Sequence, residues 1–253
     1  MEIKEKNMDS ILMYRLGDFY EMFFDDAKLC SEELELVLTG RDCGLEERAP
    51  MCGVPYHSCE SYIARLINKG FKVAICEQTE DPATAKGIVK REVVRVITPG
   101  TVIEDAMLEE GKNNYLASVF IQGNECGLCF IDASTGSVSI TDIKGDGFIS
   151  RLVSELGRFS PSEVLINESY KIHSNLVSFL SDNLSCRVSL TSDSDFEKSK
   201  NGEQIVKQFK VLSVEELKLS EGTVQTAALD YALKYLLENG IDKLSSVDKI
   251  NHY

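Results

Sequence analysis

The chain has 253 residues, of which 43% are hydrophobic and 27% are charged, close to the average for globular proteins. These proportions exclude a mainly disordered chain, a collagen and a coiled coil, and the length favours one or two domains. The formal net charge of −14 excludes broad, charge-driven binding of nucleic acid, which requires a basic surface. Any contact with nucleic acid must therefore be local.

Residues 1–103 are predicted to form a first unit of mixed strands and helices. Alternating apolar residues indicate a strand over 8–16, followed by a turn at Gly17-Asp18. The apolar positions that follow recur every three or four residues, which predicts a helix over 19–38. The remaining expected elements are a loop at 39–49, a compact proline-bounded segment at 50–57, a helix at 59–69, a strand at 71–78, a loop at 81–87 and a strand at 91–97.

Residues 104–114 are acidic and polar and are predicted to be a linker, which could include a short helix. Residues 115–240 are predicted to form a second unit, in which a meander of three strands precedes alternating helices and strands. The expected strands are 115–122, 126–134, 136–143, 163–166 and 187–190, and the expected helices are 148–156, 174–183 and 223–238. Residues 241–253 have helical spacing, and we interpret them as the truncated start of a following helical core domain. The whole pattern predicts an α/β fold with a mixed sheet.

The sequence carries no membrane or export signal. No stretch approaches the ~18 consecutive apolar residues of a membrane span, and the charged N-terminus, MEIKEKNMDS, has no apolar segment followed by a cleavage site. We therefore expect a cytoplasmic protein without membrane contact. Its eight cysteines are expected to be reduced thiols, mostly in the core.

Two groups of cysteines could in principle hold a metal. The C-G-L-C segment at 126–129 matches a C-x-x-C pattern typical of zinc or redox sites, but it lies in a predicted strand, where alternation directs the two thiols to opposite faces. Cys52, His57 and Cys59 form a looser cluster without a clear fourth ligand. We therefore predict that the chain has no metal site.

The most informative stretch is GDFYEMF at 17–23, which places two aromatic residues directly after a turn. Phe19 has two interpretations. An isolated Phe usually packs in the core, but at the start of the predicted helix Phe19 can project beyond the helix end as a wedge. Apolar side chains that insert between base steps from the minor groove kink the duplex. Glu21 would then accept a hydrogen bond from an unstacked base while repelling phosphates.

Four segments occur in order within residues 8–103: RLGDFYEMFFDDAK, PMCGVPYHS, VAICEQTEDPATAKG and VVRVITPGT. They closely resemble the N-terminal mismatch-recognition domain of the MutS family of DNA mismatch repair proteins. The NNYLAS…GLCFIDASTG run that follows resembles the connector domain of the same family. The resemblance covers nearly the whole chain. It implies a mixed α/β mismatch-recognition domain followed by a ribonuclease H-like connector domain.

The resemblance also implies roles for five residues. The F-x-E motif of the family senses the mispair, and here it falls on Phe19 and Glu21. By this resemblance Phe19 stacks on the mispaired base and Glu21 hydrogen-bonds to it. Arg41, Met51 and Arg91 occupy positions that resemble DNA contacts of the family. From the residues alone, the alternative for both arginines is a solvated surface charge.

Other implications concern activity and partners. No G-x-x-x-x-G-K-[ST] phosphate-binding loop occurs in the sequence, so we expect this chain to have no enzymatic activity and no cofactor. The full-length family member is expected to be a homodimeric ATPase that uses ATP and Mg²⁺. The expected partners are mismatched or looped duplex DNA and, through the connector, a MutL-type protein.

Two alternative functions stay open. The second unit could be a metal-dependent nuclease, because ribonuclease H-like nucleases place an Asp on a strand and Asp132 lies in such a strand. However, Asp142, Asp146 and Glu163 show no obvious convergence on it, and Asp132 is well placed to cap the turn at 134–136. The other alternative is a protein-interaction module without DNA contact.

Overall fold

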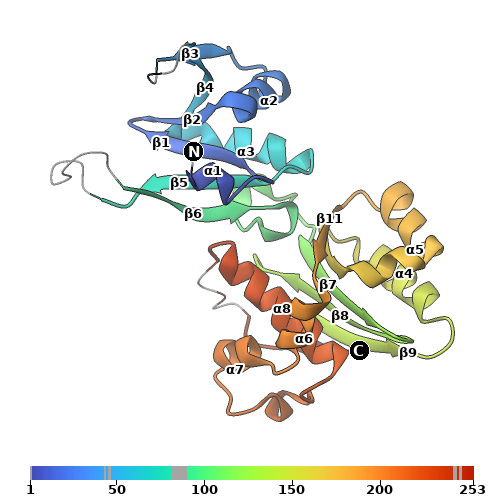
Figure 1. The fold of residues 1–253 in the computed structure, drawn as a ribbon. Helices are drawn as coiled ribbons and strands as arrows, with labels where there is room; N and C mark the ends of the chain where they lie inside the picture. Colours follow the sequence, from blue (N-terminus) through green and yellow to red (C-terminus); the bar gives the residue numbers. More distant parts are fainter. Residues whose placement is uncertain (1, 43, 45–46, 81–89, 242–243, 245–246) are drawn as a thin grey trace. The chain divides into compact units, whose positions relative to one another are not determined.

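The structure, a computed structural model, describes residues 2–253 apart from 43, 45–46, 81–89, 242–243 and 245–246. The chain divides into two compact units, each built on its own six-stranded sheet (Figure 1). The predicted α/β fold with two domains is confirmed. None of the described helices is both long and apolar enough to cross a membrane.

The two units are not divided by a single point in the chain. Unit 1 comprises Met1–Thr98 and Asp105–Met107, and unit 2 comprises Pro99–Glu104 and Leu108–Tyr253. The predicted boundary follows residue 103, with a linker over 104–114. In the structure, residues 99–101 are already buried in unit 2. There the Gly100 N–H donates to Glu163 Oε2 at 3.1 Å.

Unit 1 is built on a mixed sheet. Its elements are α1 (Glu2–Glu5), β1 (Ile11–Leu16), β2 (Phe19–Phe23), α2 (Phe24–Leu34), β3 (Thr39–Arg41), β4 (Ala49–Pro55), α3 (Cys59–Asn68), β5 (Val73–Gln78) and β6 (Arg91–Ile97). The strands lie in the order β3-β4-β2-β1-β5-β6, and only β1 and β5 pair in parallel. Helix α2 packs on β2 and β4, and α3 contacts β4 and β5. These helices cover the sheet face that carries Met22 and Cys52, both buried.

The prediction of one helix over 19–38 is wrong in its first part. Phe19–Phe23 forms strand β2, because its main chain pairs with β1 on one side and β4 on the other. Helix α2 begins at Phe24, whose φ of +54° turns the chain out of the strand. Met22 and Phe23 fitted a helical spacing with the apolar residues of α2, although they belong to a strand of period two.

Two further strands occupy segments that were predicted to be irregular. Strand β4 covers most of the proline-bounded segment at 50–57, and β3 lies within the predicted loop at 39–49. Both form by pairing with partners distant in sequence, β4 with β2 and β3 with β4. The predicted helix at 59–69 and strands at 71–78 and 91–97 are confirmed as α3, β5 and β6. The predicted loop at 81–87 lies outside the described residues.

Unit 2 contains a second mixed sheet in the order β11-β10-β7-β8-β9-β12. Its strands are β7 (Tyr115–Gln122), β8 (Glu125–Asp132), β9 (Ser137–Lys144), β10 (Glu163–Asn167), β11 (Arg187–Thr191) and β12 (Asn251–His252). Its α-helices are α4 (Phe148–Phe159), α5 (Ser174–Ser178), α6 (Asp193–Ser199), α7 (Glu203–Phe209) and α8 (Val224–Glu238). The predicted meander is β7-β8-β9, in which neighbouring strands are antiparallel.

Helices cover both faces of this sheet (Figure 1). Cys129 and Ile131 of β8 pack in the core formed with α8, whereas Leu128 and Phe130 pack in the core formed with α4 and α5. Residues of both parities in β8 are therefore buried, which is why its sequence is apolar almost throughout.

The C-terminal segment differs from its prediction. Where residues 241–253 are described, they belong to unit 2 and contain no helix. Ile241, Leu244 and Val247 are buried in the core under α8, and β12 pairs in parallel with β9. Their apolar spacing reflects burial against this core.

Candidate nucleic-acid interface

Phe19 and Glu21 lie on the same face of β2. The strand alternates, so Phe19, Glu21 and Phe23 share one face, while Tyr20 and Met22 are buried on the helix-covered face. The Phe19 side chain is 47% exposed. The interpretation of Phe19 as a core residue therefore fails, although the residue begins a strand and not a helix as the sequence analysis expected.

The two-residue turn before Phe19 is held by hydrogen bonds to both of its carbonyl groups. Arg15 Nε donates to Gly17 O at 2.6 Å, and the Tyr56 N–H donates to Asp18 O at 2.8 Å. The Arg15 guanidinium lies 3.5 Å from the centroid of the Tyr56 ring. These contacts fix the tip of the β1–β2 hairpin, from which Phe19 projects. Sequence reasoning missed Arg15 and Tyr56, because nothing in their spacing indicates that they meet.

Met51 and Arg41 lie on the same face as Glu21. In the register of β2 with β4, Met51 is opposite Phe23, and directly paired residues present their side chains on one side of a sheet. Arg41 of β3 is opposite Ala49 of β4. Ala49 is two residues from Met51, so Arg41 and Met51 lie on the same face of the sheet. The Arg41 Nη1 donates to Glu21 Oε2 and forms an ion pair with it.

Arg91 reaches this face from the other edge of the sheet. Glu21 is opposite Tyr14 of β1, Tyr14 is opposite Cys76 of β5, and Cys76 is opposite Val93 of β6. Arg91 is two residues from Val93 and therefore shares its side. Burial raises the pKa of Tyr14, and the charge of Arg91 opposes that rise, as expected for groups on one face. All five predicted contact residues thus gather on one face of unit 1.

The chemistry of these side chains suits the binding of a base and a phosphate backbone. An exposed aromatic ring on a fixed hairpin can stack on a base, since every base has a π-face. The carboxylate of Glu21, two residues along the same face, can accept a hydrogen bond from a base N–H. Arg41 and Arg91 carry the positive charge that a phosphate backbone requires.

In unit 2, Asp132 caps a turn, as predicted. The side chain is fully buried. Its Oδ1 accepts from Ser134 N at 3.0 Å, Ser134 Oγ at 2.6 Å and Thr135 N at 3.3 Å, and its Oδ2 accepts from Asn114 N at 3.2 Å. A carboxylate can accept about four hydrogen bonds, so these four bonds leave it no acceptor position for another partner.

Two other carboxylates of the nuclease alternative, Glu163 and Asp142, do not converge on Asp132. Glu163 is in register with Leu116, and Leu116 is in register with Ile131, so the side chains of Glu163 and Ile131 lie on one side of the sheet. Asp132 follows Ile131 in β8, so its side chain lies on the opposite side. Glu163 instead accepts hydrogen bonds from the hydroxyls of Ser189 and Tyr235, at 2.7 and 2.8 Å.

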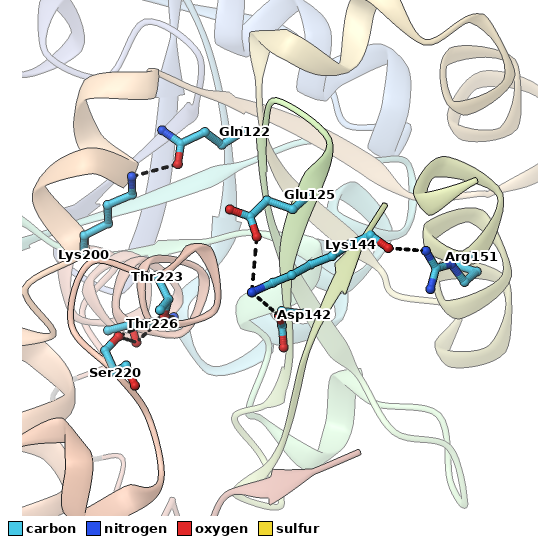
Figure 2. Close-up of polar contacts among 9 residues, drawn as sticks. All are labelled: Gln122, Glu125, Asp142, Lys144, Arg151, Lys200, Ser220, Thr223 and Thr226. Atoms are coloured by element: carbon cyan, nitrogen blue, oxygen red, sulfur yellow. Dashed lines mark hydrogen bonds and ion pairs between the residues drawn. The ribbon is translucent and has the colours of Figure 1, made fainter. Parts of the chain in front are cut away.

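Asp142 lies at the other end of the β8–β9 hairpin. It is opposite Gly127, whereas Asp132 is opposite Ser137. Figure 2 shows Asp142 and Glu125 directed to the same ammonium group, with Lys144 Nζ at 2.9 and 3.4 Å from their carboxylate oxygens. In the described part of unit 2, these acidic groups therefore form a surface ion-pair network rather than a metal site.

The cysteine motif is likewise structural. Cys126 lies in the core under α4 and Cys129 in the core under α8, so the two thiols face opposite sides of β8, as predicted. Cys52 is buried and its thiol donates to Ala27 O at 3.4 Å. Throughout the described ranges, no group of three or more His, Cys, Asp or Glu side chains is arranged to hold a metal ion.

The fold and the face of unit 1 thus define a two-domain α/β protein with a candidate binding surface. The family model described as MutS domain I matches residues 1–106, and that of MutS domain II matches residues 114–248. The chain therefore belongs to the MutS family, and the predicted resemblance is confirmed.

Proteins of the MutS family resemble this sequence over its whole length. The chain is 46% identical over 255 residues to the DNA mismatch repair protein MutS of Alkaliphilus oremlandii. It is 47% identical over 253 residues to the proteins of the same name from Ruminiclostridium cellulolyticum and Acetivibrio thermocellus. Each comparison covers 100% of this chain and 29% of the relative. The chain thus spans less than a third of the length of these relatives.

Proposed function

We propose that the chain recognises mispaired or looped duplex DNA in DNA mismatch repair. In this proposal unit 1 reads the mispair, and unit 2 is a connector that docks partners and transmits the signal. The observation that carries the proposal is the half-exposed Phe19 on a fixed hairpin tip, with Glu21 on the same face. Membership of the MutS family supports it.

In the proposed mechanism, unit 1 distinguishes a mispair from a matched pair by how easily the duplex bends at that position. A mispair stacks poorly and bends at a lower energetic cost than a matched pair, so a Phe19 wedge meets less resistance there. Stacking of a base on an aromatic ring stabilises a complex by roughly 1–3 kcal/mol. Glu21 then accepts a hydrogen bond from the exposed base edge. Arg41, Met51 and Arg91 contact the flanking backbone and groove.

The test is a titration of matched and mismatched duplexes with a full-length MutS protein that carries this chain as its N-terminal segment. We expect Phe19→Ala to lower the ratio of mismatched to matched affinity by roughly ten- to hundredfold, as loss of a stacked base implies. Phe24→Ala is the matched control, because Phe24 is another exposed aromatic of unit 1, at 39%. Retention of full discrimination by the Phe19 variant would refute the proposal.

We propose further that unit 2 has no catalytic role and is a docking surface for a MutL-type partner. The support is that the buried carboxylates Asp132 and Glu163 are engaged in structural hydrogen bonds on opposite faces. Charge reversals on the surface of unit 2 are the test, since they leave the core intact. If no variant of a complete surface scan weakens partner binding, the docking role is wrong.

The same proposal assigns the binding of ATP and Mg²⁺, and homodimerisation, to the rest of a full-length protein. It places the protein in the cytoplasm, which holds the bacterial chromosome. We expect the 253-residue chain alone to bind no nucleotide, because it encodes no phosphate-binding loop. Saturable binding of Mg-ATP in calorimetry would contradict this. We expect the isolated chain to bind DNA weakly, since its net charge is −14.

A further inference from the structure

Two of the predicted DNA contacts, Glu21 and Arg41, are partners of each other. The Arg41 guanidinium pairs with the Glu21 carboxylate, although β3 and β2 are not neighbours and β4 lies between them. The Glu21 side chain is 18% exposed and that of Arg41 is 44% exposed. The pair therefore sits at the surface, where an incoming anion can reach the guanidinium.

Gly53 of β4 lies beside the Glu21 member of this pair. It is directly opposite Glu21 in the β2–β4 register. A Cβ atom at this position would lie 3.2 Å from Tyr20 O and 3.4 Å from Glu21 Cγ, so any larger side chain would occupy the space through which Glu21 extends.

We propose that Arg41 is a positioning residue for Glu21, an inference that rests on the proposed function. In the DNA-free protein Arg41 holds the carboxylate on the binding face and neutralises it. When a duplex binds, a backbone phosphate takes over the guanidinium, and Glu21 is released to the base edge. An exposed ion pair is weak and readily exchanged, and arginine binds carboxylate and phosphate with the same planar fork.

The exchange has a physical advantage for recognition. An unpaired carboxylate at this position would repel the phosphates of every duplex before any base could be tested. The pair removes that repulsion during encounter. The carboxylate is left unpaired only where DNA already contacts Arg41.

The experiment is a double-mutant cycle in the full-length protein, with Arg41→Gln, Glu21→Gln and the double variant. The measured quantity is the ratio of mismatched to matched affinity. We expect Arg41→Gln to lower this ratio about tenfold when Glu21 is present and to have no further effect in the Glu21→Gln background. Arg41→Lys, which keeps the charge, should restore part of the ratio.

A plain phosphate contact gives a different result. Arg41→Gln would then weaken the binding of matched and mismatched duplexes equally in both backgrounds. The salt dependence of binding would fall by the amount expected for the loss of about one phosphate contact. That result overturns the inference. Arg48→Gln is the matched control, because Arg48 is an exposed arginine in the segment that follows β3, and it should show no coupling to Glu21.

A second variant tests the pair without changing any charge. Gly53→Val places a branched side chain against Glu21 and should lower discrimination as Arg41→Gln does, with circular dichroism confirming the fold. Unchanged discrimination in a folded variant would count against the inference. Failure of Phe19→Ala to change discrimination would instead refute the proposed function itself, so the two failures are distinguishable.

Discussion

The carbonyl oxygen of Val224 lies 1.9 Å from the point that a Cβ atom on Gly127 would occupy. The first turn of α8 therefore rests directly on the backbone of β8. Real Cβ atoms never approach a carbonyl oxygen so closely, so only glycine fits at this position. The C-G-L-C segment owes its glycine to this packing of helix on sheet, just as its two thiols belong to the two cores.

Gly127→Ala should therefore destabilise unit 2 strongly. The added methyl group meets backbone atoms that cannot rotate away, so we expect a loss of about 3 kcal/mol in the free energy of unfolding. Urea unfolding followed by circular dichroism measures it. Gly157→Ala in α4 is the control, since its Cβ would lie 3.6 Å from Phe179 Cζ, an ordinary contact, and alanine favours a helix by roughly 0.5–1 kcal/mol. Equal effects of the two changes would contradict the close approach.

Phe19→Ala and Met22→Ala should differ in their effect on stability, because the two side chains lie on opposite faces of β2. Met22 is fully buried on the helix side, so its truncation should cost about 2–5 kcal/mol of stability. Phe19 is half-exposed, and its truncation should cost about 1 kcal/mol or less. Chemical denaturation of the 253-residue chain tests this difference. A loss for Phe19→Ala as large as that for Met22→Ala would show that its ring packs in a core.

Asp132→Asn should act on stability and not on any cleavage of DNA. The amide keeps one acceptor oxygen but replaces the other with a donor, which leaves at least one partly buried N–H of the turn or of Asn114 without its partner. We expect a loss of roughly 1–3 kcal/mol. Thermal melting reports the stability, and incubation of branched or nicked DNA with divalent metal reports cleavage. Metal-dependent cleavage that disappears in the variant would restore the nuclease alternative.

The buried thiols should make unit 2 sensitive to alkali. Burial raises the pKa of Cys126 to about 12 and raises that of Cys129 as well, whereas a thiol in an unfolded chain ionises near ~8.5. The folded state keeps these protons longer than the unfolded chain does. The stabilisation is therefore complete below pH ~8.5 and decreases as the pH rises toward the folded-state values, by up to ~1.4 kcal/mol per pH unit for each thiol.

Two measurements check this prediction. Cys126→Ala should show a shallower decrease of unfolding free energy between pH ~9 and ~11 than the parent chain, because one of the titrating thiols is gone. In native protein at pH ~8, iodoacetamide should modify the partly exposed Cys59 before Cys126 or Cys129. Early modification of Cys126 would show that the core opens readily.

Local patterns in the sequence predicted much of this molecule. Three strand-like runs separated by turn residues identified the meander of unit 2, and the periodicity of 223–238 identified α8, because these elements are long and their neighbours in sequence are also neighbours in space. The turn at Gly17-Asp18 and the capping role of Asp132 were readable for the same reason. The gathering of Phe19 and Glu21 on one face follows from their spacing once the segment is known to be a strand.

The features that were missed depend on distant pairing. Strand β2 could not be distinguished from the start of a helix, because its partner β4 lies some thirty residues further along the chain. The stacking of Arg15 on Tyr56 and the pairing of Glu21 with Arg41 have the same origin. Spacing within one segment carries no information about which residue of another strand will lie beside it.

The interleaved boundary of the two units has a practical consequence for dissecting the protein. A cut after residue 103 would remove Asp105–Met107 from unit 1, where this segment contacts α3, and would take from unit 2 the residues whose Gly100 N–H bonds to Glu163. Two separately expressed halves must therefore share sequence: the first should extend through Met107, and the second should begin at Pro99. Each half then carries a short stretch of the other, and together they encode more residues than the chain they came from.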